Sequence, residues 1–210
     1  DGGRLVLRRE RAGGDGQDGN GQKTDHDSDH AYSSPPRSTY HPAMGTDTPP
    51  ETNRVRPDHA PTPFTAEEIR DEWVPGFRIM MRHTFPEKTM IERWTVVAAD
   101  DQGVEIENAA IDDGGSVLGE PTVVRSTWVE LRDHASFPAK HSTREWVSRS
   151  TALGDFEGWL YRVADPEAAT IQEFFFAPEL PGAPVQMLIL EGESTVFELE
   201  QTARLRPETQ

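Results

Sequence analysis

The residues best suited to bind a metal ion form one short run near the beginning of the chain. Asp25, Asp27 and Asp29 stand at alternate positions, as the first carboxylates of an EF-hand calcium loop do. The sixth position of that pattern is His30 instead of glycine, and the twelfth is Pro36 instead of a bidentate glutamate. We therefore predict a solvated polar tract that binds a divalent cation loosely at most, and no defined metal site.

A second candidate is the glycine-rich stretch from Gly13 to Gly21. It resembles a single nonapeptide of the calcium-binding β-roll repeats, with Asp18 as the carboxylate ligand and Asn20 at the position that should be apolar. A β-roll builds each calcium site from consecutive stacked turns, so one copy leaves the coordination incomplete. The same letters approach a dinucleotide or phosphate-binding loop, but the residues that follow cannot form the helix that such loops require. We predict a linker here and no cofactor.

The rest of the chain offers little that could catalyse a reaction. The histidines after residue 62 are His83, His134 and His141, and none has the spacing of a zinc-binding motif. The run from Gly114 to Leu118 has leucine where a nucleophile elbow needs its second glycine. Neighbouring carboxylates, such as Asp112 and Asp113, are better explained as turn formers than as an acid and base pair. We therefore expect a protein that is not an enzyme.

Composition excludes further classes. The 210 residues contain no cysteine, which excludes disulfides, thiolate nucleophiles and cysteine-ligated metal centres. There are 37 Asp and Glu against 21 Lys and Arg, a formal charge of -16, which argues against nucleic acid or anionic lipid headgroups as main partners. No run approaches the roughly 18 apolar residues that a transmembrane segment needs.

Two regions differ sharply in composition. All 5 Trp and all 9 Phe lie between Phe64 and Phe197. Residues 10–62 are rich in Gly, Asp, Pro, Ser and Thr, and they cannot bury enough apolar surface to offset the entropy of ordering. We predict an irregular N-terminal arm over residues 1–62 and a β domain over residues 63–210.

Within the β domain, Thr65 and Glu68 form a capping box that predicts a short helix ending near Trp73. Short apolar runs separated by explicit turn residues predict strands. The expected strands are 77–84, 89–99, 103–111, 121–131, 143–151, 156–164, 170–177, 184–191 and 194–204. Because no connection is long enough for a crossover helix, these strands should pair as an antiparallel meander. The fold class is mainly β: one strongly curved antiparallel sheet, a half-barrel or barrel-like meander, with one or two short helices.

Three stretches carry a resemblance to a known family. They run from Trp128 to Pro138, from Leu153 to Tyr161 and from Phe175 to Val185, with the order G-x-F-x-x-W-x-Y and then F-A-x-x-x-P-G-x-P-V. This order resembles uncharacterised exported bacterial β-proteins akin to the periplasmic lipoprotein carriers of the LolA type, over roughly residues 77–205. The resemblance implies a curved antiparallel sheet, an extracytoplasmic location in the periplasm or at the cell surface, and a hydrophobic groove.

Several large apolar residues would line such a groove in the concave face of the sheet, although most of them are also natural core residues. The candidates are Trp94, Trp128, Phe156, Trp159, Tyr161, Phe175 and Met187. Two functions stay open. The first is a non-catalytic extracytoplasmic accessory or structural subunit, whose residues 1–62 order on a larger protein assembly. The alternative is a LolA-like carrier of lipid or another apolar ligand.

Overall fold

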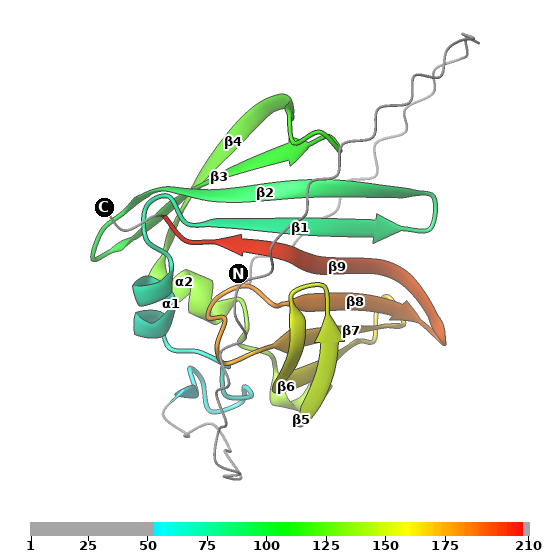
Figure 1. Ribbon diagram of the computed structural model, residues 1–210. Helices are drawn as coiled ribbons and strands as arrows, with labels where there is room; N and C mark the ends of the chain where they lie inside the picture. Colours follow the sequence, from blue (N-terminus) through cyan, green and yellow to red (C-terminus); the bar gives the residue numbers. More distant parts are fainter. Residues whose placement is uncertain (1–52, 208–210) are drawn as a thin grey trace, which may run out of the picture. The chain divides into compact units, whose positions relative to one another are not determined.

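The computed structural model describes residues 53–207, which form one antiparallel sheet of nine strands with two short α-helices (Figure 1). The strands are β1 (Arg78–Phe85), β2 (Lys88–Ala99), β3 (Gly103–Ile111), β4 (Val117–Thr127), β5 (Ser142–Thr151), β6 (Gly154–Asp165), β7 (Thr170–Phe176), β8 (Gln186–Glu191) and β9 (Ser194–Leu205). The helices are α1 (Ala66–Glu72) and α2 (Trp128–Asp133), and a 3₁₀ turn, η2, covers Ala139–His141. The predicted fold class, a mainly β protein with a single curved antiparallel sheet, is confirmed.

The order of the strands is β4-β3-β2-β1-β9-β8-β7-β6-β5. Consecutive strands pair throughout, as a meander requires, except that β4 and β5 lie at opposite edges of the sheet. The first and last strands, β1 and β9, pair with each other in the middle. Since β4 and β5 do not pair, the sheet is open, which is the half-barrel form of the prediction and not the closed one.

One predicted strand, 121–131, is wrong in its last four residues. β4 begins earlier, at Val117, and ends at Thr127, after which residues 128–131 belong to α2. A second capping box is the physical reason. The Thr127 hydroxyl accepts a hydrogen bond from the Glu130 amide, and the Glu130 carboxylate accepts one from the Thr127 amide.

The helices cover one face of the sheet, which we call the helix face. Ile69 of α1 and Trp128 of α2 pack in one apolar cluster with Ile79, Val96 and Phe176 from the strands. α1 and α2 themselves lie next to each other. The predicted helix near Thr65 is confirmed, with its capping box formed as expected.

The opposite face of the sheet is covered by the β5–β6 hairpin. Phe156 of this hairpin packs against a second apolar cluster that contains Leu160, Phe175 and Val185. The backbone amide of Ala152, at the tip, donates a 2.8 Å hydrogen bond to Glu200 of β9. The hairpin therefore curls back across β7 and β8, which explains why these strands can be apolar on both faces.

Residues 53–62, which fall in the predicted arm, lie against the β domain. The Tyr161 hydroxyl donates a 2.7 Å hydrogen bond to the Pro61 carbonyl, and the Ala60 amide donates to the Phe137 carbonyl at 2.8 Å. Thr62 is fully buried. The division of the chain at residue 62 stays a prediction, because residues 1–52 lie outside the described part. Within residues 53–207, neither helix is long and apolar enough to cross a membrane.

Candidate functional site

The metal-ligating candidates of the N-terminal region, Asp18, Asp25, Asp27 and Asp29, lie outside the described residues. Among residues 53–207, no three His, Asp or Glu side chains gather closely enough to hold a metal ion. His83 of β1 lies beside Glu92 of β2, with 3.1 Å between its Nε2 atom and the carboxylate, and its ring meets the edge of Phe197. His134 follows α2 and is exposed, and His141 lies in η2.

The seven predicted groove residues do not share one surface. Trp94, Trp159, Tyr161 and Met187 point to the helix face, as the strand register shows. Trp128 lies on α2 and packs into the cluster beneath the helices. Phe175 lies on the opposite face, and Phe156 of the curled hairpin packs against the cluster that contains it. The sheet itself thus separates the seven residues into two groups, and the groove that would unite them stays a prediction.

Three of these seven residues are buried, and two of those three donate hydrogen bonds to the backbone. Tyr161 and Phe175 have no exposed surface, and Trp128 is 5% exposed. Burial raises the pKa of the Tyr161 hydroxyl to about 12, so that this group stays protonated and donates to the Pro61 carbonyl. The Trp128 indole donates a 2.8 Å hydrogen bond to the Asp100 carbonyl. These two bonds tie Tyr161 to residues 53–62 and α2 to the β2–β3 turn.

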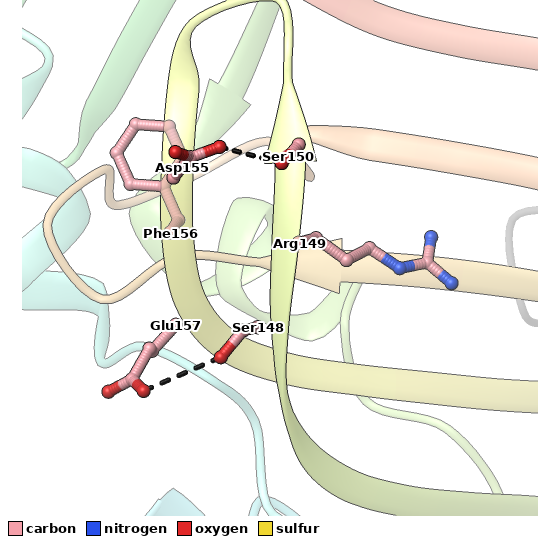
Figure 2. A pocket seen from close by; sticks show the side chains of 6 residues that line it. All are labelled: Ser148, Arg149, Ser150, Asp155, Phe156 and Glu157. Atoms are coloured by element: carbon pink, nitrogen blue, oxygen red, sulfur yellow. Dashed lines mark hydrogen bonds between the residues drawn. The ribbon is translucent and has the colours of Figure 1, made fainter.

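Two surface hollows each contain one of the seven residues, Phe156 in the first and Trp128 in the second. The first, of about 260 Å³, is lined by the paired strands of the hairpin: Ser148, Arg149, Ser150, Asp155, Phe156 and Glu157 (Figure 2). Ser150 and Asp155 face each other there with a 2.6 Å hydrogen bond, while the Arg149 side chain extends away from the Asp155 side of the hairpin. The second hollow, of about 310 Å³, lies between α1 and α2 and is lined by Glu67, Arg70, Asp101, Trp128 and their neighbours.

Arg149 belongs to a charged row on the face of the sheet that the hairpin covers. It donates to Glu173 of β7 at 2.6 Å and to Gln186 of β8 at 2.7 Å. Arg162 of β6 donates to the other oxygen of Glu173 at 2.7 Å. These contacts hold the hairpin down on β7 and β8, and they describe a structural network, since each charge has a partner of opposite sign.

The most exposed apolar surface belongs to β4, one of the two edge strands. Every residue from Val117 to Arg125 is exposed, including four large aliphatic side chains: Val117 (39%), Leu118 (55%), Val123 (58%) and Val124 (47%). Val123 and Val124 are adjacent, so one points to each face of the sheet. A strand that is apolar and exposed on both faces is unusual at a free edge, where a second strand can pair.

The other edge strand, β5, is polar by comparison. Its ten residues are mostly Ser, Thr, Arg and Glu. Its one large exposed apolar residue, Trp146 (43%), packs edge to face against Trp159 with ring centroids 5.0 Å apart. Charged residues and inward-directed arginines are common protections of a sheet edge. β4 is therefore the better candidate for a binding surface.

The predicted binding residues do not include any residue of β4. The segment is predicted as a strand, but the strand order that puts it at the edge of the sheet is not. One signal was present: the adjacent aliphatic pairs Val117-Leu118 and Val123-Val124 flank Gly119 and Pro121, and proline within a strand is typical of an edge. Adjacent aliphatic residues in such a strand predict apolar surface on both faces.

No protein family matches the sequence, and no curated protein does. Among solved structures, the chain is similar to a chain of the Pseudomonas aeruginosa MucA/MucB complex, with a TM-score of 0.46 and 13% identity over 67% of this chain and 53% of that chain. It is also similar to MucB in complex with MucA(peri), with a TM-score of 0.45 and 13% identity over 66% of this chain and 52% of that chain. For the crystal structure of MucB, the TM-score is 0.45 and the identity 11%, over 66% of this chain and 56% of that chain.

The chain thus spans a little more than half the length of these neighbours. At this level of identity and TM-score we infer no function from the likeness, and we base the function on this chain's own residues.

Proposed function

We propose that the protein is a non-catalytic, extracytoplasmic accessory subunit that binds a larger protein assembly. The observation that carries this proposal is β4, an edge strand with exposed aliphatic side chains on both faces. Soluble proteins usually protect such edges, because unpaired backbone groups beside apolar side chains promote association with another chain. A protein partner accounts for this surface. The extracytoplasmic location is supported by the sequence resemblance to exported β-proteins.

The N-terminal region supplies a second contact in this proposal. Residues 1–52 contain few large apolar side chains, so a partner surface would provide the burial that their own sequence lacks. A segment of this length that orders on a partner adds affinity even if each residue contributes little. The β domain and the N-terminal region would then bind the same assembly at two places.

A second candidate function is the carriage of an apolar ligand on the helix face. Some apolar residues of this face lie only partly covered: Met90 is 43% exposed, and Met187 and Leu199 are half-buried. An apolar ligand would lie against these three side chains.

Affinity purification of the tagged 210-residue chain from its own host distinguishes the two functions. The accessory subunit predicts a stoichiometric protein partner, and deletion of residues 1–52 should loosen that complex while the free energy of unfolding of the β domain changes little. The matched control is deletion of residues 208–210. Recovery of lipid with no stoichiometric protein would contradict the accessory subunit and support the carrier.

A further inference from the structure

We propose that β4 is a docking strand, whose edge from Thr122 to Ser126 pairs with an extended protein segment that carries adjacent aliphatic residues flanked by Lys or Arg. This inference rests on the proposed function, and it names the site and the chemistry of the partner. The mode is strand addition, in which backbone hydrogen bonds supply affinity and side chains on alternate positions supply specificity.

The outer edge of β4 is free. β4 pairs only with β3, through contacts such as Val124 with Ile106 and Val123 with Glu107. In the part of the chain that the structure describes, no strand pairs with its other edge. The backbone groups on that edge are therefore available to another strand.

Only part of β4 is regular enough for a second strand to pair with it. Asn108 of β3 pairs with Thr122 of β4, and Ala110 pairs with Leu118. An interval of two residues on β3 is thus matched by an interval of four on β4, so the register of the pairing shifts at this point. The extra residues form a bulge that contains Gly119, at φ +75°, and Pro121, which has no backbone N–H to donate. Strand addition over the bulge is blocked, and the regular segment from Thr122 to Ser126 remains.

The segment from Thr122 to Ser126 is held in place before any partner binds. Arg125 donates to Asp100 at 2.7 Å and to Glu105 at 3.1 Å. The Arg125 guanidinium, together with the Gln102 and Gly103 amides, lowers the pKa of the Asp100 carboxyl below its ordinary value. Directly after β4, the Thr127 capping box fixes the start of α2. A strand that is ordered in advance binds with a smaller loss of entropy.

The side chains of β4 and its neighbours determine which residues the bound segment should carry. A strand next to β4 places one side chain beside Val123 on one face and the next beside Val124 on the other, so its central residues should be adjacent aliphatics. At the bulge end of β4, the exposed carboxylates of Asp112, Asp113 and Glu120 have no oppositely charged partner within salt-bridge distance among residues 53–207. These carboxylates favour Lys or Arg in the part of the bound segment that extends past Thr122 toward the bulge.

A second copy of the chain fits this edge less well. Each copy carries a formal charge of -16, so a β4–β4 pair would bring two acidic domains together. The bound segment is thus better supplied by a separate, basic partner.

A synthetic peptide tests the proposal directly. The chain's own residues 4–11, Arg-Leu-Val-Leu-Arg-Arg-Glu-Arg, have the required pattern of adjacent aliphatics flanked by arginines. We therefore use this octapeptide, fluorescently labelled, as the probe for the 210-residue protein, and the same peptide with every Arg replaced by Glu as its control. Fluorescence anisotropy reports affinity, and amide hydrogen exchange of the unmodified protein reports the location.

The expected result is that the basic peptide slows exchange at β4 amides between Thr122 and Ser126, leaves β5 unchanged, and binds at least about 10-fold more tightly than the acidic control. Val123→Glu and Val124→Glu should each weaken binding by about 10-fold or more. The matched control is Ile171→Glu, because Ile171 is 42% exposed but lies on an interior strand. That variant should bind like the unmodified protein.

Equal binding of the two peptides, slowed exchange on β5 instead of β4, or unchanged affinity in both β4 variants would overturn the proposal. So would β4 amides that are already protected before peptide is added. In that case, a dimer in sedimentation velocity would identify a second copy as the occupant, and a monomer would identify the chain's own N-terminal region. The exchange measurement uses the unmodified protein, so it decides the question even if a variant fails to fold.

Affinity purification tests the docking strand and the accessory role separately. If affinity purification recovers a stoichiometric protein complex that Val123→Glu and Val124→Glu leave intact, the docking strand is wrong and the accessory subunit survives. If no protein complex is recovered, the proposed function itself is wrong.

Discussion

Replacement of Glu173 by Gln tests how the curled β5–β6 hairpin is held to the sheet. One carboxylate oxygen of Glu173 accepts from Arg149 at 2.6 Å and the other accepts from Arg162 at 2.7 Å. The Glu173 side chain is only 9% exposed. Glu173→Gln keeps the size of the side chain but removes the charge and one of the two acceptors.

The magnitude follows from these contacts. A hydrogen bond to a charged group contributes about 1.5–3 kcal/mol, so two such bonds set an upper range of about 3–6 kcal/mol. Arg162 is 43% exposed and keeps Glu145 as a partner, Arg149 keeps Gln186, and the new amide can still accept one bond. We therefore expect Glu173→Gln to lower the free energy of unfolding at pH 7 by about 2–3 kcal/mol.

The effect should depend on pH in a defined direction. Burial disfavours the ionised form of Glu173, but the hydrogen bonds from Arg149 and Arg162 outweigh it and lower the pKa of the carboxyl below its ordinary value. The stability that comes from a lowered pKa is complete above the unfolded-state pKa, about 4.3, and is lost as the pH falls through the folded-state pKa. The difference between the two proteins should therefore shrink below about pH 4.

Urea unfolding at pH 7, 5, 4 and 3 provides the measurement. Glu157→Gln is the matched control, since Glu157 lies on the same hairpin but is exposed, and within residues 53–207 its side chain has a single hydrogen bond of 3.5 Å, from Ser148. A loss smaller than about 0.5 kcal/mol at pH 7, or a loss that stays constant down to pH 3, would refute this account of the hairpin.

Three further predictions concern the parts that surround the sheet. Glu72→Gln should lower the free energy of unfolding by about 3–5 kcal/mol, because it leaves Arg204, only 7% exposed, without its carboxylate partner. Urea unfolding measures this loss, and Glu67→Gln on the exposed side of α1 is the control. Deletion of residues 1–62 should lower the midpoint of thermal unfolding relative to deletion of residues 1–52, because the buried Tyr161 hydroxyl loses the Pro61 carbonyl; equal midpoints would contradict this. Thr127→Ala should destabilise the protein by about 1 kcal/mol through loss of the α2 cap, as measured by urea unfolding, and Thr127→Ser should restore most of it.

Local signals predicted much of the fold. The Thr65 and Glu68 capping box gave the correct start of α1, and turn residues such as Asp100 lie where the hairpins reverse. The same capping signature at Thr127 and Glu130 was missed, because Val129 and Leu131 stand at alternate positions, as the apolar residues of a half-buried strand do. A strand pattern and a short helix overlap in such a stretch, and only the cap distinguishes them.

Non-local features could not be predicted in the same way. The pairing of β1 with β9 joins the two ends of the domain and has no signature in either strand. The sequence does not show which element provides cover for the apolar residues on both faces of β7 and β8. Part of it is supplied by the β5–β6 hairpin, whose return over Phe175 depends on contacts such as that of Ala152 with Glu200.

The candidate site also depends on non-local features that the sequence does not show. Large aromatic residues are expected both in cores and in grooves, so residue type alone could not separate Tyr161, which is fully buried, from surface residues. Exposure of Val123 and Val124 follows from the position of β4 at the edge, which is set by the strand order of the whole sheet.

Native mass spectrometry of the full chain purified from its own host tests the central claim most directly, since it detects bound protein and bound lipid in one experiment. We predict a complex with a protein partner in fixed stoichiometry, which Val123→Glu and Val124→Glu dissociate and Ile171→Glu does not. A chain that carries only lipid, in the unmodified protein and in all three variants alike, would contradict it.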